Sequence, residues 1–94
     1  MYAERTPRAN QDVFRRANER LLAAVRDVVD DSRAIPFLCE CFDPECRSTV
    51  QLSIERFRDL REMDNRYAIF TGHPIMNGER PIEVEGDVTI VQKL

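Results

Sequence analysis

The chain has 94 residues, of which 43% are hydrophobic and 33% are charged, and its formal net charge at pH 7 is −3. This length fits one domain, and the composition is that of a globular protein rather than a disordered one. No apolar run approaches the roughly 20 residues that cross a bilayer, which argues against a membrane protein. Charges of both signs are mixed and form no basic block, which argues against nucleic acid as a partner.

The opening residues, MYAERTPRANQ, lack the apolar segment of a secretory signal peptide. We therefore expect a cytoplasmic protein, and in that compartment its thiols would stay reduced. Residues 1–9 are expected to form a flexible lead-in, and residues 10–94 a single small domain.

The first predicted element is an amphipathic helix from about residue 10 to residue 29. Its apolar residues recur at intervals of three and four, which places them on one stripe of a helix. They are Val13, Phe14, Ala17, Leu21, Ala24, Val25 and Val28. The charged residues lie mostly off this stripe, and Arg15, Arg16 and Arg20 are candidates for contact with a partner. The stripe either packs on the chain's own domain or lies along a partner, and a homodimer through this helix is one such contact.

Residues 37–54 predict a β-hairpin that carries the cysteines near its tip. FLCEC and STVQLSI both alternate as strands do, and the DPE sequence between them is typical of a turn. A short helix follows, because Ser53 stands where an N-cap is needed and SIERFRDLREM holds apolar residues at helical spacing.

The last third of the chain predicts a small antiparallel sheet. YAIF is a short strand, TGHPIMNGERP is a loop rich in glycine and proline, and IEVEGDVTIVQ is a terminal hairpin that turns at residues 85–87. The order α, ββ, α, β, ββ defines an α+β fold. The predicted core includes Phe14, Leu21, Val25, Phe37, Val50, Leu52, Phe57, Leu60, Ile69, Ile82, Val84, Val88 and Ile90.

All three cysteines fall in eight consecutive residues, at Cys39, Cys41 and Cys46. Because side chains alternate along a strand, the first two sulfurs face the same side, and the turn at residues 43–44 can bring the third beside them. Three thiols suit disulfides poorly but suit a metal ion that takes a fourth ligand elsewhere. The one histidine, His73, follows the YAIF strand and completes a Cys3His set, which is a standard tetrahedral zinc site. Zinc would also stabilise a chain whose hydrophobic core is small.

Other interpretations of the cysteine cluster stay open. The C-x-C spacing is tighter than the C-x2–4-C pairs of most structural zinc sites. Three thiols also fit an iron–sulfur cluster, a redox switch in which Cys46 bridges to one of the others, or small buried residues that hold no metal. The acidic neighbours Glu40, Asp43 and Glu45 are expected to raise thiol pKa values, whereas Arg47 has the opposite effect.

The chain resembles a family of small actinobacterial-type proteins in the segment FLCECFDPECRSTVQLSIERFRDLREMDNRYAIFTGHPI. These proteins share an F-x-C-E-C, D-P-x-C and P-G-H pattern, and the similarity covers residues 10–92. The motifs match at Cys39, Glu40, Cys41, Asp43, Pro44, Cys46, Gly72 and His73. Thr71 stands where many members have proline, and VQLSIERF replaces a more acidic run. The resemblance implies that the cysteines and the histidine form one constellation, but it implies no reaction, because the family has no assigned activity.

Sequence patterns that mark enzymes are absent, including H-E-x-x-H, G-x-S-x-G, the P-loop and the zinc-deaminase pattern. A zinc enzyme would need an open coordination position and a base such as Glu40 or Glu45, and it is the least favoured class. We expect a small zinc-stabilised protein-interaction module with a regulatory role and an unidentified protein partner. The alternative is a thiol-based redox- or metal-responsive regulator that loses its metal on oxidation.

Overall fold

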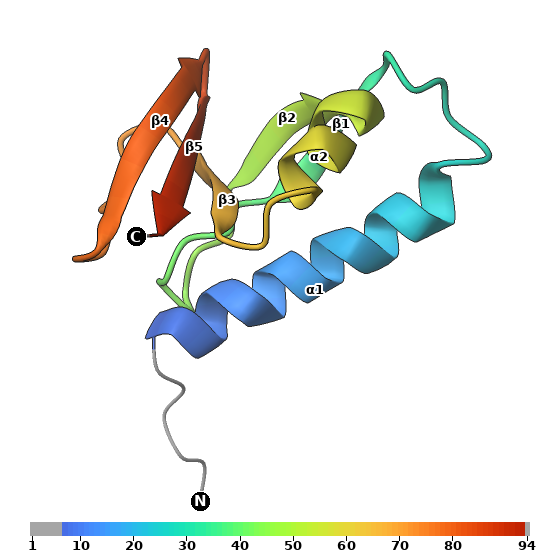
Figure 1. Cartoon of the computed structure of the whole chain (residues 1–94). Helices are drawn as coiled ribbons and strands as arrows, with labels where there is room; N and C mark the ends of the chain where they lie inside the picture. Colours follow the sequence, from blue (N-terminus) through green and yellow to red (C-terminus); the bar gives the residue numbers. More distant parts are fainter. Residues whose placement is uncertain (1–6, 94) are drawn as a thin grey trace, which may run out of the picture.

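A computed structural model describes residues 7–93, which form the predicted α+β fold (Figure 1). The elements are α1 (Pro7–Val25), β1 (Ala34–Leu38), β2 (Thr49–Ser53), α2 (Ile54–Arg61), β3 (Arg66–Phe70), β4 (Glu79–Glu85) and β5 (Val88–Lys93). They make a two-stranded antiparallel sheet, β1–β2, and a three-stranded antiparallel sheet in the order β3–β5–β4. This is the predicted order of elements. No helix in the described part of the chain is long and apolar enough to cross a membrane.

Helix α1 begins and ends earlier than the sequence predicts. It starts at Pro7, where proline suits the first helical position, and ends at Val25 rather than near residue 29. Of the expected lead-in, residues 1–6 lie outside the described residues, and residues 7–9 belong to the helix.

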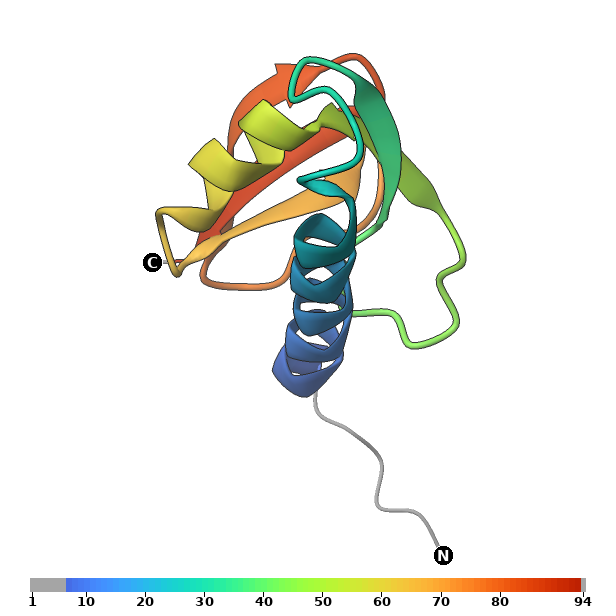
Figure 2. The ribbon, with the colours of Figure 1, turned by 90° about the vertical axis from the view of Figure 1, so that its right-hand side faces the viewer.

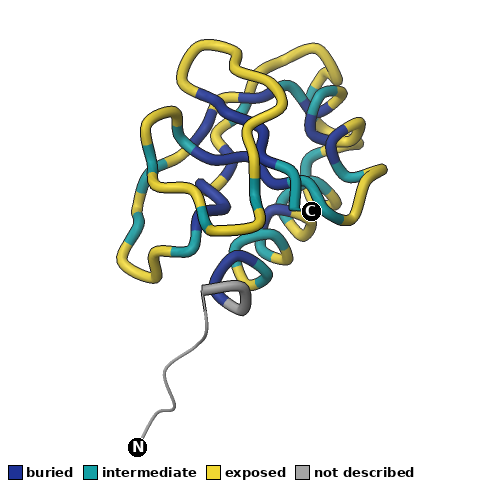
Figure 3. Tube along the Cα trace, turned by 60° about the vertical axis from the view of Figure 1, so that its left-hand side comes forward, coloured by how far each residue is buried: buried dark blue, intermediate teal, exposed yellow. Residues whose placement is uncertain are grey.

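The buried face of α1 differs from the predicted apolar stripe. Val13 and Val28 are 39% and 82% exposed, whereas Asn10, Gln11 and Asn18 are at most 3% exposed. At 100° per residue, this places the buried face roughly 60° around the helix from the stripe. Figure 3 shows buried positions recurring on this helix. The face of α1 that contacts the domain differs from the predicted one because these polar residues have hydrogen-bond partners on the rest of the domain.

Helix α2 packs on the β1–β2 sheet through an apolar core. The rings of Phe37 and Phe57 stack with centroids 4.1 Å apart and planes inclined by 6°. Ser53 caps the helix as predicted, since its hydroxyl accepts a hydrogen bond from the backbone N–H of Arg56 at 3.1 Å. The surrounding core residues are Phe37, Val50, Leu52, Phe57, Leu60, Ala68, Val88 and Ile90. The sheets and α2 thus share one core, beside which α1 lies in both ribbon views (Figures 1 and 2).

Strand β5 is buried at Val88–Val91, whereas β4 is an exposed edge strand. The predicted core positions Ile82 and Val84 are therefore wrong, because they are 38% and 62% exposed. β4 pairs only with β5, and a register shift between Pro81 and Glu83 bends it. Phe14, Leu21 and Val25 are only partly buried. The prediction also omitted the buried residues Ile54, Tyr67, Ala68 and Val91.

Candidate metal centre

The four predicted ligands converge on one point of the structure. One ligand atom from each of Cys39, Cys41, Cys46 and His73 lies within 4.8 Å of the other three. Nδ1 of His73 is 3.3 Å from Sγ of Cys39 and 3.9 Å from Sγ of Cys46. Ligand atoms around a tetrahedral zinc ion, with bonds of about 2.1–2.3 Å, lie about 3.5–3.8 Å apart. The four residues therefore lie close enough to hold a metal ion after small movements.

Cys39 and Cys41 lie in the connection that follows β1. The strand ends at Leu38, so these cysteines are not inside the FLCEC strand that the sequence predicted. The antiparallel pattern still continues for one residue, because the Cys39 N–H donates to the carbonyl of Ser48 at 3.0 Å. Both cysteines are 2% exposed.

The turn at Asp43 returns Cys46 to the other two cysteines, as predicted. The Asp43 carboxylate accepts a hydrogen bond from the backbone of Glu45 at 2.9 Å, and the Asp43 carbonyl accepts one from the backbone of Cys46 at 3.1 Å. The Arg47 guanidinium donates to the carbonyls of Pro44 and Cys46, each at 3.1 Å. The acidic residue at position 43 thus shapes the loop that holds the third cysteine.

His73 reaches the cysteines from the turn after β3. Its backbone N–H donates to the carbonyl of Phe70 at 3.1 Å, and Gly72 adopts a φ of 97°, which a side chain would disfavour. The imidazole also lies 5.5 Å from the Phe70 ring, centroid to centroid. Two ligand-bearing loops, one after β1 and one after β3, therefore meet at the centre.

Burial dominates the electrostatics of the two inner thiols. It raises the pKa of Cys39 and of Cys41, and for Cys39 the neighbouring cysteines add to this rise. A backbone N–H from Phe70 points at Sγ of Cys39 at 3.1 Å and acts in the opposite direction. From the sequence we expected acidic neighbours to raise the thiol pKa values. In the structure, burial and the neighbouring thiols raise them. A buried pair of thiolates needs a compensating positive charge, and a bound cation supplies one.

Glu40, between the two inner cysteines, is fully buried rather than solvated. Its carboxylate accepts hydrogen bonds from the Asn18 side chain at 2.9 Å and from the Ala68 backbone at 3.0 Å, and it pairs with Arg61. The Glu40 N–H donates to the Ala68 carbonyl at 2.8 Å. Burial raises the pKa of this carboxyl group, and Arg61 opposes the rise. Glu40 therefore joins the cysteine segment to α1, α2 and β3.

Three buried amides of α1 hold the ligand-bearing segments, and sequence reasoning missed all of them. Asn18 donates to the Leu38 carbonyl at 2.9 Å and accepts from the Leu38 N–H at 2.8 Å, as a neighbouring strand would. Asn10 donates to the carbonyl of Phe42 at 3.1 Å. Figure 1 shows the β1–β2 connection reaching this N-terminal part of α1. The sequence did carry a sign of these contacts, because the three amide residues recur at helical spacing. The apolar stripe on the same helix made that sign easy to miss.

The candidate partner-binding arginines divide into two groups. The Arg15 side chain is 16% exposed, contacts Glu19 at 3.3 Å and lies 5.4 Å from the centroid of the Tyr67 ring. Arg16 and Arg20 are exposed and lie one turn apart. Arg15 therefore packs against the domain, while the other two face away from it.

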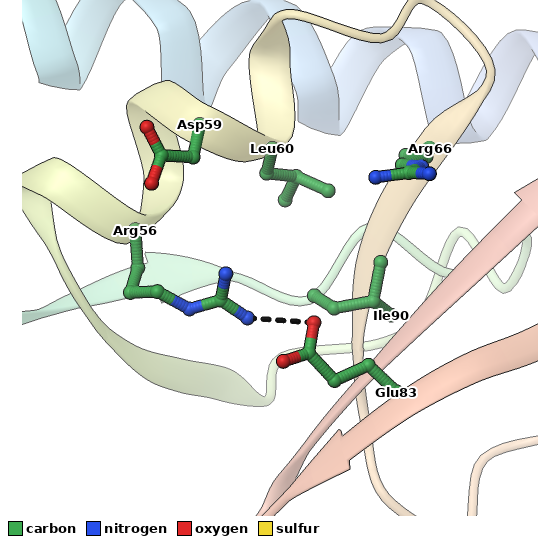
Figure 4. Close-up of a pocket in the computed structure, with 6 residues that line it drawn as sticks. All are labelled: Arg56, Asp59, Leu60, Arg66, Glu83 and Ile90. Atoms are coloured by element: carbon green, nitrogen blue, oxygen red, sulfur yellow. Dashed lines mark hydrogen bonds and ion pairs between the residues drawn. The ribbon is translucent and has the colours of Figure 1, made fainter.

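A small cavity of about 60 Å³ lies away from the metal centre, between α2 and the three-stranded sheet (Figure 4). It is lined by Arg56, Asp59, Leu60, Arg66, Glu83 and Ile90. Arg56 pairs with Glu83 across it at 2.8 Å. Such a volume holds a few water molecules and no larger ligand.

The fold and the cluster together define a small α+β domain with a Cys3His set able to hold a metal ion. Comparisons with protein-family models, with curated proteins and with solved structures found no match for this chain.

Proposed function

We propose that this chain is a small zinc-stabilised protein-interaction module with a regulatory role. The observation that carries the proposal is the convergence of Cys39, Cys41, Cys46 and His73 within 4.8 Å. Thiolate and imidazole ligands in a set of four favour zinc among the common metal ions. A set in which the protein supplies all four ligands is typical of structural rather than catalytic zinc.

A structural role also fits the position of the centre in the fold. Its ligands come from the β1–β2 connection and from the turn after β3, so a bound ion would join the two small sheets. Small domains bury a limited fraction of their surface, and metal-binding free energy then adds directly to folding free energy. The reduced thiols that this role needs support a cytoplasmic location.

A protein partner is proposed for the outer side of α1. Val13, Arg16 and Arg20 fall within about 60° of one another on the helix and are all exposed. This mixture of an apolar and two guanidinium side chains suits a protein surface that carries carboxylates. A homodimer through α1 is the competing form of this contact, and the resemblance to the F-x-C-E-C family is part of the same proposal.

Metal content tests the zinc proposal directly. The chain is purified without chelator as wild type, as Cys46→Ser and as Glu45→Gln, a control that changes an exposed side chain in the same turn. We expect one zinc per chain in the wild type and the control. The Cys46→Ser variant should lose the zinc and melt about 10 °C lower or more, as removal of a few kcal/mol does in a domain of this size. A folded wild type without metal would contradict the proposal.

A redox- or metal-responsive regulator is the second candidate, favoured by the uneven burial of the centre. Cys39 and Cys41 are buried, whereas Cys46 and His73 are only half-buried, so a small oxidant can approach from their side. Peroxide would take two electrons from two thiolates, forming a disulfide and two water molecules after proton uptake and releasing the metal. Release of zinc by peroxide, reversed by a thiol reductant, supports the regulator. Retention of zinc under peroxide supports the interaction module.

A further inference from the structure

Helix α1 is fastened to the domain mainly by polar side chains. Asn10, Gln11 and Asn18 are buried, whereas the apolar Leu21 and Leu22 are only partly buried at the margin of the core. Hydrogen bonds of this kind need their acceptors in fixed positions, and a buried amide that loses its partner is costly. The docking of α1 therefore depends on the geometry of the backbone that receives it.

That receiving backbone is the segment that carries two of the metal ligands. Residues 38–42 alternate between two sides, with Cys39 and Cys41 directed to the centre and Glu40 directed away from it. Asn18 contacts both the backbone of Leu38 and the Glu40 carboxylate. The segment 38–42 thus holds the candidate metal site on one side and α1 on the other.

The other ligand-bearing loop is joined to α1 through Glu79, the first residue of β4. Gln11 donates to the Glu79 carboxylate at 3.0 Å, and the same carboxylate accepts a hydrogen bond from the backbone of Met76 at 3.0 Å. Met76 lies three residues after His73 on this loop. The N-terminal half of α1 therefore contacts the β1–β2 connection directly through Asn10 and reaches the His73 loop through Glu79.

Without a metal, the two loops lose the bonds that would hold their ligands in one cluster. The neutral thiols and the imidazole then make only weak contacts with one another. The loops gain freedom to move, and the groups that accept hydrogen bonds from α1 move with them. A 19-residue helix with little apolar burial is marginal on its own, so α1 would be the first element to open.

We propose that docking of α1 and occupation of the metal centre are coupled, with Asn18 and Glu40 transmitting the coupling. Metal holds α1 on the domain, and docked α1 tightens the binding of metal. The inference depends on the proposed zinc site. Because such coupling is reciprocal, the factor by which metal favours docking equals the factor by which docking favours metal. Through this coupling, bound metal would control whether the outer surface of α1, formed by Val13, Arg16 and Arg20, is held in place on the domain.

Hydrogen exchange of the wild-type chain gives the first test. Backbone amides of α1 and of β5 are followed at 20 °C with zinc and after removal of zinc by a chelator. We expect exchange in α1 to accelerate at least fivefold more than in β5, since coupling energies usually correspond to about 5- to 150-fold. Equal acceleration in both elements, or unchanged exchange in α1, would overturn the coupling.

Metal affinity of two α1 variants gives the reciprocal test. Asn18→Ala removes the side chain that contacts Leu38 and Glu40, and Ala23→Gln is the control because Ala23 lies exposed on the same helix and glutamine is a good helix former. Competition with a chromophoric chelator should give a zinc dissociation constant about tenfold higher for Asn18→Ala and unchanged for Ala23→Gln. Exchange protection of β5 shows in each case that the domain is folded.

The outcomes separate the two proposals. If the wild type binds no zinc, the zinc module is wrong and the coupling falls with it. If it binds zinc but Asn18→Ala has the zinc affinity of Ala23→Gln, only the coupling is wrong. An Asn18→Ala chain that loses protection in β5 while zinc is bound also overturns the coupling, because Asn18 then supports the whole fold rather than α1.

Discussion

The two helices of this domain are held by different kinds of contact. Helix α2 is short, and its inner residues Ile54, Phe57 and Leu60 are apolar and buried. Helix α1 is more than twice as long, yet its most buried side chains are the amides of Asn10, Gln11 and Asn18. The longer helix therefore has the more polar interface.

Because of this difference, the two helices require different things of the segments that they pack against. Apolar burial is non-directional and scales with the area removed from water, so α2 needs mainly a surface of suitable shape. Hydrogen bonds are directional, so α1 needs particular backbone groups in particular places. Those groups lie in Leu38, the last residue of β1, and in the β1–β2 connection that carries the three cysteines. Helix α2 is thus held by apolar packing on the core, whereas α1 is held by hydrogen bonds to the segment that carries the candidate metal ligands.

The largest loss of stability is expected when the stacked ring of Phe57 in α2 is removed. Phe57→Ala should lower the free energy of unfolding by about 3–5 kcal/mol, because Phe57 is fully buried and stacks on Phe37. Urea denaturation with saturating zinc measures the loss. Met63→Ala is the control, because Met63 continues the same apolar spacing but is 43% exposed, and it should change stability by less than about 0.5 kcal/mol. Similar losses in the two variants would contradict the apolar basis of α2 docking.

The next largest effect is expected at the buried ion pair between Arg61 of α2 and Glu40, whose carboxylate also accepts a hydrogen bond from Asn18 of α1. Glu40→Gln should lower the free energy of unfolding by about 3 kcal/mol, because it leaves the charge of Arg61 buried without its partner. Glutamine preserves the size of the side chain, so the loss reports charge and hydrogen bonding rather than volume. The double variant Glu40→Gln with Arg61→Met should recover part of the loss in a double-mutant cycle. Additive losses would show that the two residues act independently.

The sequence predicted the metal cluster and the α2 interface better than the α1 interface, for physical reasons. Cys39, Cys41, Cys46 and His73 form a rare combination of residue types, and the turn at Asp43 brings the three cysteines together as turn chemistry predicts. The spacing of Phe57 and Leu60 likewise follows directly from helix geometry. These features depend on local rules that a single chain displays.

The residues that the sequence missed depend on contacts between distant segments. Asn18 is buried because it meets the backbone of Leu38, and Glu40 because it meets Arg61 and Ala68. A polar side chain carries no local sign of such a partner, so it is predicted to be exposed. Ile82 shows the converse error, since β4 is an exposed edge strand and leaves its apolar residues partly in solvent.

Ionisation of Tyr67, which lies against Arg15 of α1, tests the α1 interface by pH. Tyr67 is buried, and burial raises its pKa, although Arg15 opposes the rise. Because the folded-state pKa lies above the unfolded value of about 10, the folded protein holds the proton more tightly, and stability falls as the pH rises above about 10. Urea denaturation at pH 9 and pH 11 should show a larger loss for the wild type than for Tyr67→Phe. Equal losses would show that ionisation of other groups accounts for the alkaline decline.

The smallest effect is expected for the ion pair between α2 and the edge strand. Arg56 contacts Glu83 at 2.8 Å and Glu85 at 3.7 Å beside the small cavity of Figure 4. These side chains are 37–69% exposed, so solvent screens the attraction, and Glu83→Gln should cost less than about 1 kcal/mol. The loss should vanish in 1 M salt, where the Debye length is about 3 Å. Denaturation in low and high salt measures it, and a larger, salt-independent loss would mean that polar contacts also fasten α2.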